Sequence, residues 1–253
     1  IRDSYKSVVT KYFNPTGTLS TWYEGAEVGD IWGYTVNDLF RSQEDLDSYL
    51  SKVDMTHIAA NWNTGDLKYE DINHDGKVNN GTNTIGNHGD LSVIGNDQPH
   101  YQYTINGGVS YKGFDFSMLW RGVAKKDMYF YRGSNIYWGF MGGWWESCLT
   151  PEHLDYFRDQ PGSKYSGLYE GDANINTDAY WPRPYLNNTE EAKNKNHANT
   201  RYLQNAAYLR LQNVQLGYSF PRSITSKMHL EKLRIYFSGE NLLTFSKLPN
   251  GID

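Results

Sequence analysis

The chain has 253 residues, with 24 Lys and Arg against 29 Asp and Glu, so its formal charge at neutral pH is −5. This acidic balance excludes a protein that holds nucleic acid through a basic surface. Apolar residues make up only 38% of the chain, while aromatic residues reach 15% beside 24 glycines, a mixture that favours strands and turns over helices. The single cysteine, Cys148, excludes an intramolecular disulfide and any metal site built from several cysteines.

No targeting segment is recognisable near the first residue of the given sequence. The first residue is Ile1 and no basic stretch followed by an apolar stretch stands near it, so we expect a fragment or a processed chain. No window approaches the roughly 18 consecutive apolar residues of a membrane-spanning helix. This excludes a helical membrane protein, whereas a transmembrane β-barrel has its apolar residues at every second position.

Short helices are predicted at two places along the chain. Ser42 is a plausible N-cap, and the acidic residues Glu44, Asp45 and Asp47 follow it, so residues 42–52 are predicted to form a surface helix. Thr150 followed by proline opens a second helical turn.

The segment 71–79 has the spacing of half a calcium loop. Oxygen ligands stand at the first, third, fifth, seventh and ninth positions, namely Asp71, Asn73, Asp75, the carbonyl of Lys77 and Asn79. Gly76 allows the sharp turn at the sixth position, but Thr82 occupies the twelfth, where such loops carry a glutamate. Two interpretations stay open: a bound Ca²⁺, or a tight turn stabilised by its own Asp and Asn side chains.

Residues 101–121 predict a tight antiparallel hairpin. Apolar and polar residues alternate from Tyr101 to Tyr111, and the alternation resumes from Phe114 to Trp120 after the short break at residues 112–113. Each arm is about 10 residues long, which is the length of a membrane-crossing strand. Aromatic residues stand at both ends of the apolar face, as in the interfacial girdle of a transmembrane barrel.

Residues 129–145 combine aromatic rings with glycines. Flat rings stack on sugars or pack against a partner protein, so the candidates for contact with a substrate or a covering partner are Tyr129, Tyr131, Tyr137, Trp138, Trp144 and Trp145. The alternative is a loop held together by its own aromatic rings. The same two interpretations apply to Trp22, Tyr23 and Trp32 and to the stiff run 180–185.

A second pair of strands is predicted near the end of the chain. Its first arm runs from Leu209 to Phe220 and changes phase near Asn213, which indicates a bulge. A turn at residues 221–223 leads to a return strand over residues 232–239, and a further strand is expected to begin at Asn241. Long polar segments, 61–99 and 122–200, separate the predicted hairpins, as the external loops of a barrel do.

Five motifs in order carry a family resemblance: residues 29–34 (GDIWGY), 65–78 (GDLKYEDINHDGKV), 111–115 (YKGFD), 201–218 (RYLQNAAYLRLQNVQLGY) and 238–244 (SGENLLT). Together they resemble the C-terminal barrel region of the SusC/RagA family of TonB-linked outer-membrane transporters. Asn79 and Asn80 depart from the acidic residues that family members often carry there, which weakens the metal interpretation.

The resemblance implies an all-β fold: the C-terminal part of a large antiparallel transmembrane β-barrel of the 22-stranded type, with long extracellular loops. Residues 1–253 would form a single domain fragment that lacks the plug, the TonB box and the closing strand. The implied function is import of oligosaccharides or oligopeptides across the bacterial outer membrane, with a SusD-like surface lipoprotein and TonB as partners.

Two other classes remain as alternatives. A soluble β-rich carbohydrate-binding module would also be rich in Trp, Tyr, Asn and Gly. A β-rich glycoside hydrolase would need a pair of carboxylates, for which residues such as Glu24, Asp30 and Glu152 could be named without any evidence that they meet. No nucleophile elbow, phosphate loop or zinc-binding histidine pair is present, so no enzyme is expected.

Overall fold

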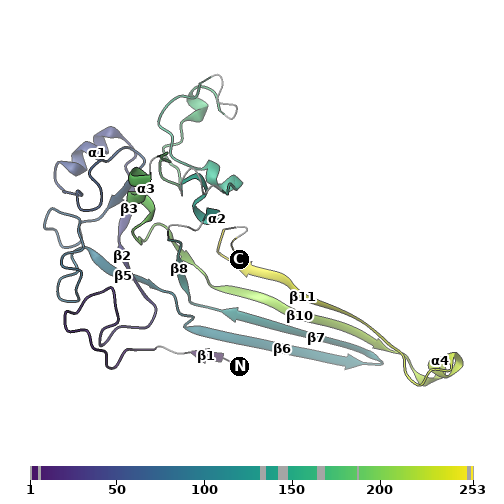
Figure 1. The fold of residues 1–253 in the computed structure, drawn as a ribbon. Coiled ribbons are helices and arrows are strands. Elements are labelled where there is room, and N and C mark those ends of the chain that lie inside the picture. The colour runs from purple at the N-terminus through teal and green to yellow at the C-terminus, as the bar shows by residue number, and fades with distance from the viewer. Residues whose placement is uncertain are drawn as a thin grey trace.

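The computed structural model describes residues 2–4, 7–131, 135–141, 148–163, 169–186, 188–249 and 252. Their fold is mostly β, with a few short helices, and it has two parts. A sheet of long strands extends to one side, and a cluster of loops, short strands and helices lies at one end of it (Figure 1). We call this second part the loop cluster; it comprises the described residues of 7–100 and 124–207.

The long sheet is antiparallel throughout and has the strand order β1-β6-β7-β10-β11. Its strands are β1 (Arg2–Ser4), β6 (Tyr101–Tyr111), β7 (Phe114–Val123), β10 (Tyr208–Ser219) and β11 (Arg234–Ser246). The predicted hairpin of residues 101–121 is confirmed as β6 and β7. Lys112 and Gly113 join them with positive φ angles of 46° and 90°, as the tightest hairpin turns require.

The bulge predicted near Asn213 is confirmed. The register shifts between Leu211 and Asn213 on both sides of β10, where it pairs with β7 and with β11. The prediction of a separate last strand from Asn241 is wrong, because β11 continues through this residue to Ser246. Asn241 has a φ of 53°, so it changes the phase of the strand at a bulge instead of reversing the chain.

The loop cluster contains three small antiparallel pairs. β2 (Asp30–Tyr34) pairs with β5 (Leu91–Asn96), β3 (Val36–Leu39) with β4 (Leu67–Tyr69), and β8 (Asp127–Tyr129) with β9 (Leu203–Asn205). These strands are short and their partners are distant in sequence, so the two long polar segments of the sequence are folded loops with few regular elements.

The helices are all short. They are α1 (Gln43–Leu50), α2 (Asn135–Trp138), α3 (Asn188–Lys195) and α4 (Arg222–Thr225), with 3₁₀ turns η1 (Gly139–Met141), η2 (Pro151–Leu154), η3 (Asp172–Asn174) and η4 (Ser226–Met228). The two predicted helical segments are confirmed as α1 and η2; the Ser42 side chain caps α1 by accepting from the Asp45 backbone N–H at 3.2 Å. Among the described residues, no helix is long and apolar enough to cross a membrane.

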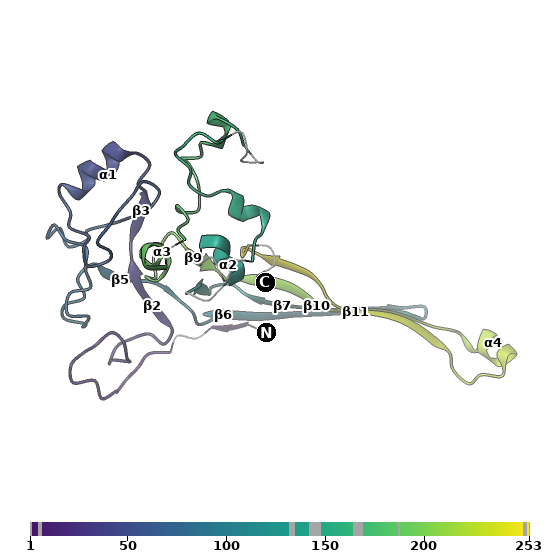
Figure 2. The ribbon, with the colours of Figure 1, turned by 45° about the horizontal axis from the view of Figure 1, so that its top comes forward.

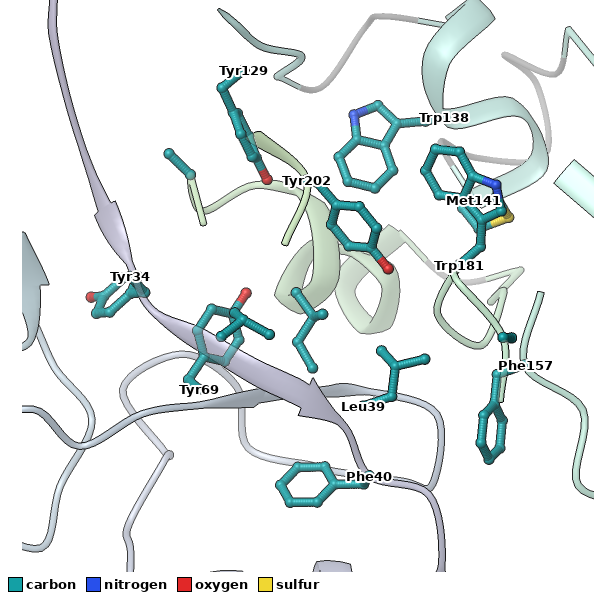
Figure 3. Packing of buried hydrophobic residues seen from close by; sticks show 14 of the residues in the cluster. Tyr34, Leu39, Phe40, Tyr69, Tyr129, Trp138, Met141, Phe157, Trp181 and Tyr202 are labelled. Carbon is teal, nitrogen blue, oxygen red and sulfur yellow. The ribbon is translucent and has the colours of Figure 1, made fainter. Parts of the chain in front are cut away.

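The hydrophobic core lies wholly in the loop cluster. Its largest fully buried side chains are Trp138, Tyr69, Tyr137, Tyr202, Phe40 and Phe157. Figure 3 shows the packing around Trp138, Tyr202 and Tyr69. No residue of β6, β7, β10 or β11 belongs to it. The scarce apolar mass of the sequence therefore forms one aromatic core in the loops, and the apolar residues of the long strands pack against nothing comparable.

Candidate functional site

Cross-strand pairing gathers the apolar residues of the long strands on one face of the sheet. In one row Ile105 lies opposite Trp120, which lies opposite Leu211 and then Leu243. A second row joins Val109, Phe116, Leu216 and Phe237. We call this the apolar face. Leu211 is buried, but Val109, Phe116, Leu216 and Phe237 are 63%, 36%, 51% and 64% exposed, so each of the four strands exposes a large apolar side chain on this face.

The opposite face, which we call the polar face, carries the alternate residues of the same strands. One row there joins Gly108, Ser117, Gln215 and Ser238, and another joins Thr104, Arg121, Arg210 and Thr244. Arg234 and Asp115 form an ion pair at 2.6 Å, and Arg210 donates to the Thr244 hydroxyl at 3.0 Å. A sheet with one face of each kind is suited to a boundary between an apolar environment and water.

Aromatic rings mark both ends of the apolar face. At the end beside the β6–β7 turn, the rings of Phe114 and Tyr218 are 4.4 Å apart, and Tyr218 contacts Phe220 at 4.9 Å. At the end beside the loop cluster, Trp120 stacks with Phe245 at 6.3 Å. Tyrosine and tryptophan prefer the boundary between hydrocarbon and water. Aromatic rings at both ends of the apolar face therefore fit a set of strands that spans a bilayer.

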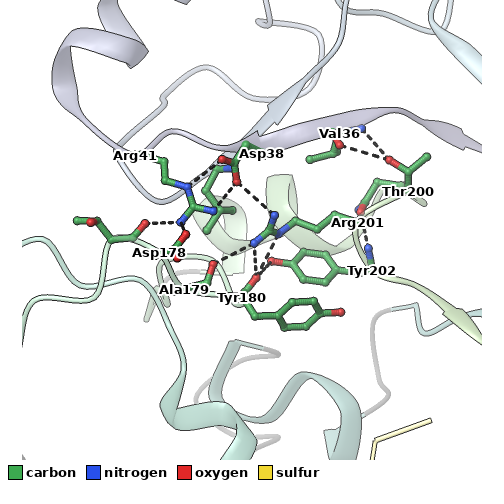
Figure 4. A network of polar contacts seen from close by, with 12 residues as sticks. Val36, Asp38, Arg41, Asp178, Ala179, Tyr180, Thr200, Arg201 and Tyr202 are labelled. Atoms are coloured by element: carbon green, nitrogen blue, oxygen red, sulfur yellow. Dashed lines mark hydrogen bonds and ion pairs between the residues drawn. The ribbon is translucent and has the colours of Figure 1, made fainter. Parts of the chain in front are cut away.

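An arginine network joins three distant segments of the loop cluster (Figure 4). Asp38 accepts from Arg41 at 2.7 and 2.8 Å and from Arg201 at 3.3 Å. Arg201 also donates to the carbonyls of Ala179 and Tyr180. Burial alone would raise the pKa of Asp38, but hydrogen bonds from Arg41 and from a backbone N–H, with the charges of both arginines, hold it below its ordinary value.

A fully buried ion pair fixes α3 against residues 61–69. The Lys193 ammonium lies 2.7 Å from the Asp66 carboxylate, and neither side chain is exposed. Asp66 also accepts from Tyr185 at 2.8 Å and from Asn194 at 2.9 Å, so its oxygens are well satisfied. Burial raises the pKa of Asp66, while Lys193 and these donors favour its charged form. No motif in the sequence indicates this ion pair, although the spacing of Glu191 and Lys195, which are four residues apart and paired at 2.6 Å, favours a helix there.

The structure places the candidate aromatic residues in different surroundings. Tyr129, Tyr137 and Trp138 are only 6%, 2% and 1% exposed. The Trp138 ring lies 5.1 Å from that of Tyr202, and its indole N–H donates to the Phe130 carbonyl at 2.6 Å. These three side chains belong to the core and present no free ring face, so packing is the role that the structure describes for them.

The remaining aromatic candidates are either exposed or outside the described residues. Tyr131 is half exposed and lies beside Tyr129 at 5.0 Å, so contact with a ligand or partner stays a prediction for it. Trp144 and Trp145 lie outside the described residues. Trp22 is exposed and, with Tyr23, Trp32, Glu27 and Asp30, lines a pocket of about 120 Å³.

The candidate calcium loop is held by its own side chains. Asp71 accepts from the backbone N–H groups of Asp75 at 3.2 Å and Gly76 at 2.8 Å, Asn73 accepts from that of Asp75 at 3.0 Å, and Asp75 accepts from that of Lys77 at 2.8 Å. The buried Asp90 ties both ends of the loop by accepting from Ile72 and Asn79. No group of three or more His, Cys, Asp or Glu suited to a metal ion occurs in the part of the chain that the structure describes.

Comparisons with known proteins agree with the motifs in the sequence. TonB-dependent receptors P3 and P26 of Formosa agariphila are 24% and 23% identical to the chain, over 230 and 222 residues. These matches cover 89% and 88% of this chain but 18% and 19% of the receptors, so the chain spans about a fifth of the length of the curated relatives it matches. No family model matches.

One solved structure with a similar fold is that of the RagAB peptide transporter. The TM-score is 0.51 at 16% sequence identity, over 95% of this chain and 22% of that chain. At this identity the likeness concerns the fold alone. The five ordered motifs and the two receptor relatives make the chain similar in sequence to SusC/RagA-type TonB-dependent receptors, and its fold is similar to that of the RagAB transporter.

Proposed function

We propose that this chain forms part of the barrel wall and the external loops of an outer-membrane transporter, in a barrel of the 22-stranded type. The observation that carries the proposal is the apolar face, which is exposed across four strands while the opposite face is polar. In the bilayer, acyl chains would cover the apolar face and the polar face would line the lumen. A soluble module would need to enclose this face in a core, and the core of the chain lies elsewhere.

Neighbouring positions on β6 provide the test. In the full-length transporter with Cys148 replaced by serine, a fluorescent label is attached at V109C or at S110C, which belong to opposite faces. We expect a lipid-borne quencher to reach the label at position 109 and aqueous iodide to reach the label at position 110. Equal quenching of both labels from water would overturn the proposal.

For the substrate, we propose oligosaccharides. Support comes from Trp22 and Tyr131, whose aromatic rings are exposed to solvent on the loop cluster, because such rings stack on the apolar faces of sugars. Import of oligopeptides is the alternative, and the solved neighbour is described as a peptide transporter.

Uptake measurements distinguish the two substrates. Cells that carry the full-length transporter are given labelled oligosaccharides or labelled oligopeptides. The variants W22A and Y131A are compared with F13A, which removes another exposed aromatic ring of the loop cluster. We expect sugar uptake that falls in the first two variants. Uptake of peptides alone would reject the oligosaccharide proposal.

The proposal includes two protein partners and no covalent chemistry. A SusD-like surface lipoprotein would cover the loop cluster, and TonB would act on the transporter through its N-terminal region. The relatives are named as receptors and the structural neighbour as a transporter, which supports a function without catalysis. Co-purification of a lipoprotein with the tagged full-length transporter from outer membranes tests the first partner.

A further inference from the structure

The connection between β10 and β11 is a folded turn that displays its apolar residues. We call residues 220–233 the basic turn. It projects beyond the sheet at the end opposite the loop cluster and contains α4 and η4 (Figure 1; Figure 2). Thr225 is its one buried residue, and its carbonyl accepts from the Leu230 N–H at 3.0 Å. Ile224, Met228 and Leu230 are all exposed, so this turn is ordered by backbone bonds while its apolar side chains face outward.

The basic turn is positively charged in an acidic chain. Arg222, Lys227 and Lys232 are exposed, and the segment carries a single acidic residue, Glu231. Lys112 adds a fourth exposed cation from the adjacent β6–β7 turn. The two turns lie side by side, because the Ser219 N–H donates to the Gly113 carbonyl at 2.7 Å. The whole chain has a charge of −5, so the net charge of these two turns is opposite in sign to that of the rest of the chain.

An aromatic belt lies where the apolar face meets the basic turn. Phe114, Tyr218 and Phe220, the first residue of the turn, are joined by ring contacts of 4.4 Å and 4.9 Å, and Tyr111 lies opposite Phe114. Along the sheet the order is therefore apolar face, aromatic belt, then cations mixed with exposed apolar residues. A bilayer has the same order of acyl chains, interface and headgroups.

We propose that the basic turn docks on a bilayer surface that contains anionic phospholipids. Arg222, Lys227, Lys232 and Lys112 contact lipid phosphates, and Ile224, Met228 and Leu230 enter the boundary of the acyl chains. The inference rests on the proposed function, since that function places the apolar face in lipid and so brings the turn to the headgroups. Continuity with that face and the complementary charge favour lipid over a protein partner.

The test uses the full-length transporter in nanodiscs made from phosphatidylcholine with phosphatidylglycerol. Native mass spectrometry counts the lipids of each kind that stay bound to the protein. We expect enrichment of phosphatidylglycerol that weakens with added salt. In the variant R222Q/K227Q/K232Q most of the enrichment should be lost, because each basic residue near the surface contributes separately.

Three comparisons keep the result decisive. K11Q/K52Q/K125Q removes the same charge from exposed lysines of the loop cluster and should retain the enrichment, as should the conservative variant K227R/K232R. I224S/M228S should weaken retention without a change in charge. Equal binding of both lipids by the unaltered transporter, or an equal loss in the loop-cluster control, would overturn the proposal.

Failure of this inference is distinguishable from failure of the proposed function. If the label at position 109 lies in lipid but the transporter binds both lipids equally, the barrel proposal stands and the anionic docking surface is rejected. Tight retention of a periplasmic protein by the basic turn, with no lipid preference, would assign the surface to a protein instead. If the triple variant does not fold, the salt dependence of the unaltered transporter and the I224S/M228S variant still decide.

Discussion

At the scale of single residues, adjacent side chains on one strand have opposite surroundings. Ile105 belongs to the apolar face and its neighbour Asn106 to the polar face. We expect I105R to cost roughly 2–4 kcal/mol if it lies near the bilayer midplane, because a guanidinium is then placed among acyl chains. N106R should be tolerated, since it faces water.

Urea unfolding of the full-length transporter in lipid vesicles measures both variants. The pair is a matched comparison, because the same side chain enters at successive positions of β6. Equal destabilisation by both arginines would contradict the assignment of the two faces.

The buried ion pair of the loop cluster gives a second prediction at this scale. K193M leaves the fully buried Asp66 carboxylate without its cation, and we expect a loss of roughly 3–5 kcal/mol in the stability of the loop cluster. D66N/K193M should recover part of this loss, because no unpaired charge is then buried. Hydrogen exchange of the loop-cluster amides measures the change.

A more exposed pair is the control for that experiment. Lys68 and Asp45 also form an ion pair at 2.5 Å, but their side chains are 22% and 34% exposed. K68M should therefore cost less than about 1 kcal/mol. If K68M and K193M reduce stability by similar amounts, burial does not determine how much each ion pair contributes to the stability of the loop cluster.

The arginine network predicts a pH dependence. The pKa of Asp38 is held below its ordinary value of 3.8. A carboxylate whose pKa is lower in the folded state adds stability above pH 3.8, and this stability is lost as the pH falls from 3.8 through the lower, folded-state pKa. We expect tryptophan fluorescence to report weaker loop packing in that acidic range, with D38N weakened already at neutral pH and less sensitive to acid.

Asp172 provides a control for Asp38 because it is exposed and lies outside the network. D172N should leave the acid transition of the loop cluster unchanged. An acid transition that is the same in D38N as in the unaltered protein would assign the pH dependence to other groups.

At the scale of elements, regular alternation was predictable and irregular packing was not. The hairpin of β6 and β7 is evident in the sequence because every second residue from Tyr101 is apolar or aromatic and a two-residue turn follows. The strands β2 to β5 have three to six residues, too few to establish a period, and they pair with segments far along the chain.

The aromatic residues of the candidate site could not be assigned to the core from the sequence either. Tyr137 and Trp138 are surrounded by glycines and aromatic residues in the sequence, so stacking on a ligand and packing in a core predict the same composition. Only the long-range contacts of Trp138 with Trp181 and Tyr202 distinguish the two, and no local pattern encodes them. The charged residues of α3 likewise conceal a buried pair, because Lys193 has the appearance of a solvated surface residue.

The loop around Asp71 yields a prediction at the scale of the element. Asp71 accepts two backbone hydrogen bonds, so D71A should lower the stability of residues 71–79 by about 1 kcal/mol without any metal. If Ca²⁺ also binds there, added calcium should protect these amides from hydrogen exchange in the unaltered protein and not in D71A. If added calcium does not change hydrogen exchange in the unaltered protein, the loop binds no Ca²⁺ and is a turn stabilised by its own side chains.

At the scale of the whole molecule, the two parts obtain their stability in different ways. The loop cluster encloses an aromatic core and buried ion pairs, as a water-soluble fold does. The long sheet has no comparable core, and among the described strands β1 and β11 form its open edges. In the proposed barrel, neighbouring strands would cover these edges and acyl chains would cover the apolar face, and both would stabilise the sheet in place of a core.

This difference predicts how the 253-residue chain behaves alone. Without detergent, the exposed apolar face and the open edges should cause self-association, and gel filtration should show large species in place of a monomer. Detergent micelles should disperse them, because they cover the apolar face. Replacing Val109, Leu216 and Phe237 together with serine should reduce the association, whereas replacing the polar-face residues Gln215 and Ser238 with alanine should not. A sharp monomeric peak from the unaltered chain in plain buffer would mean that the apolar face closes on itself, and the transporter function would have to be abandoned for a soluble module.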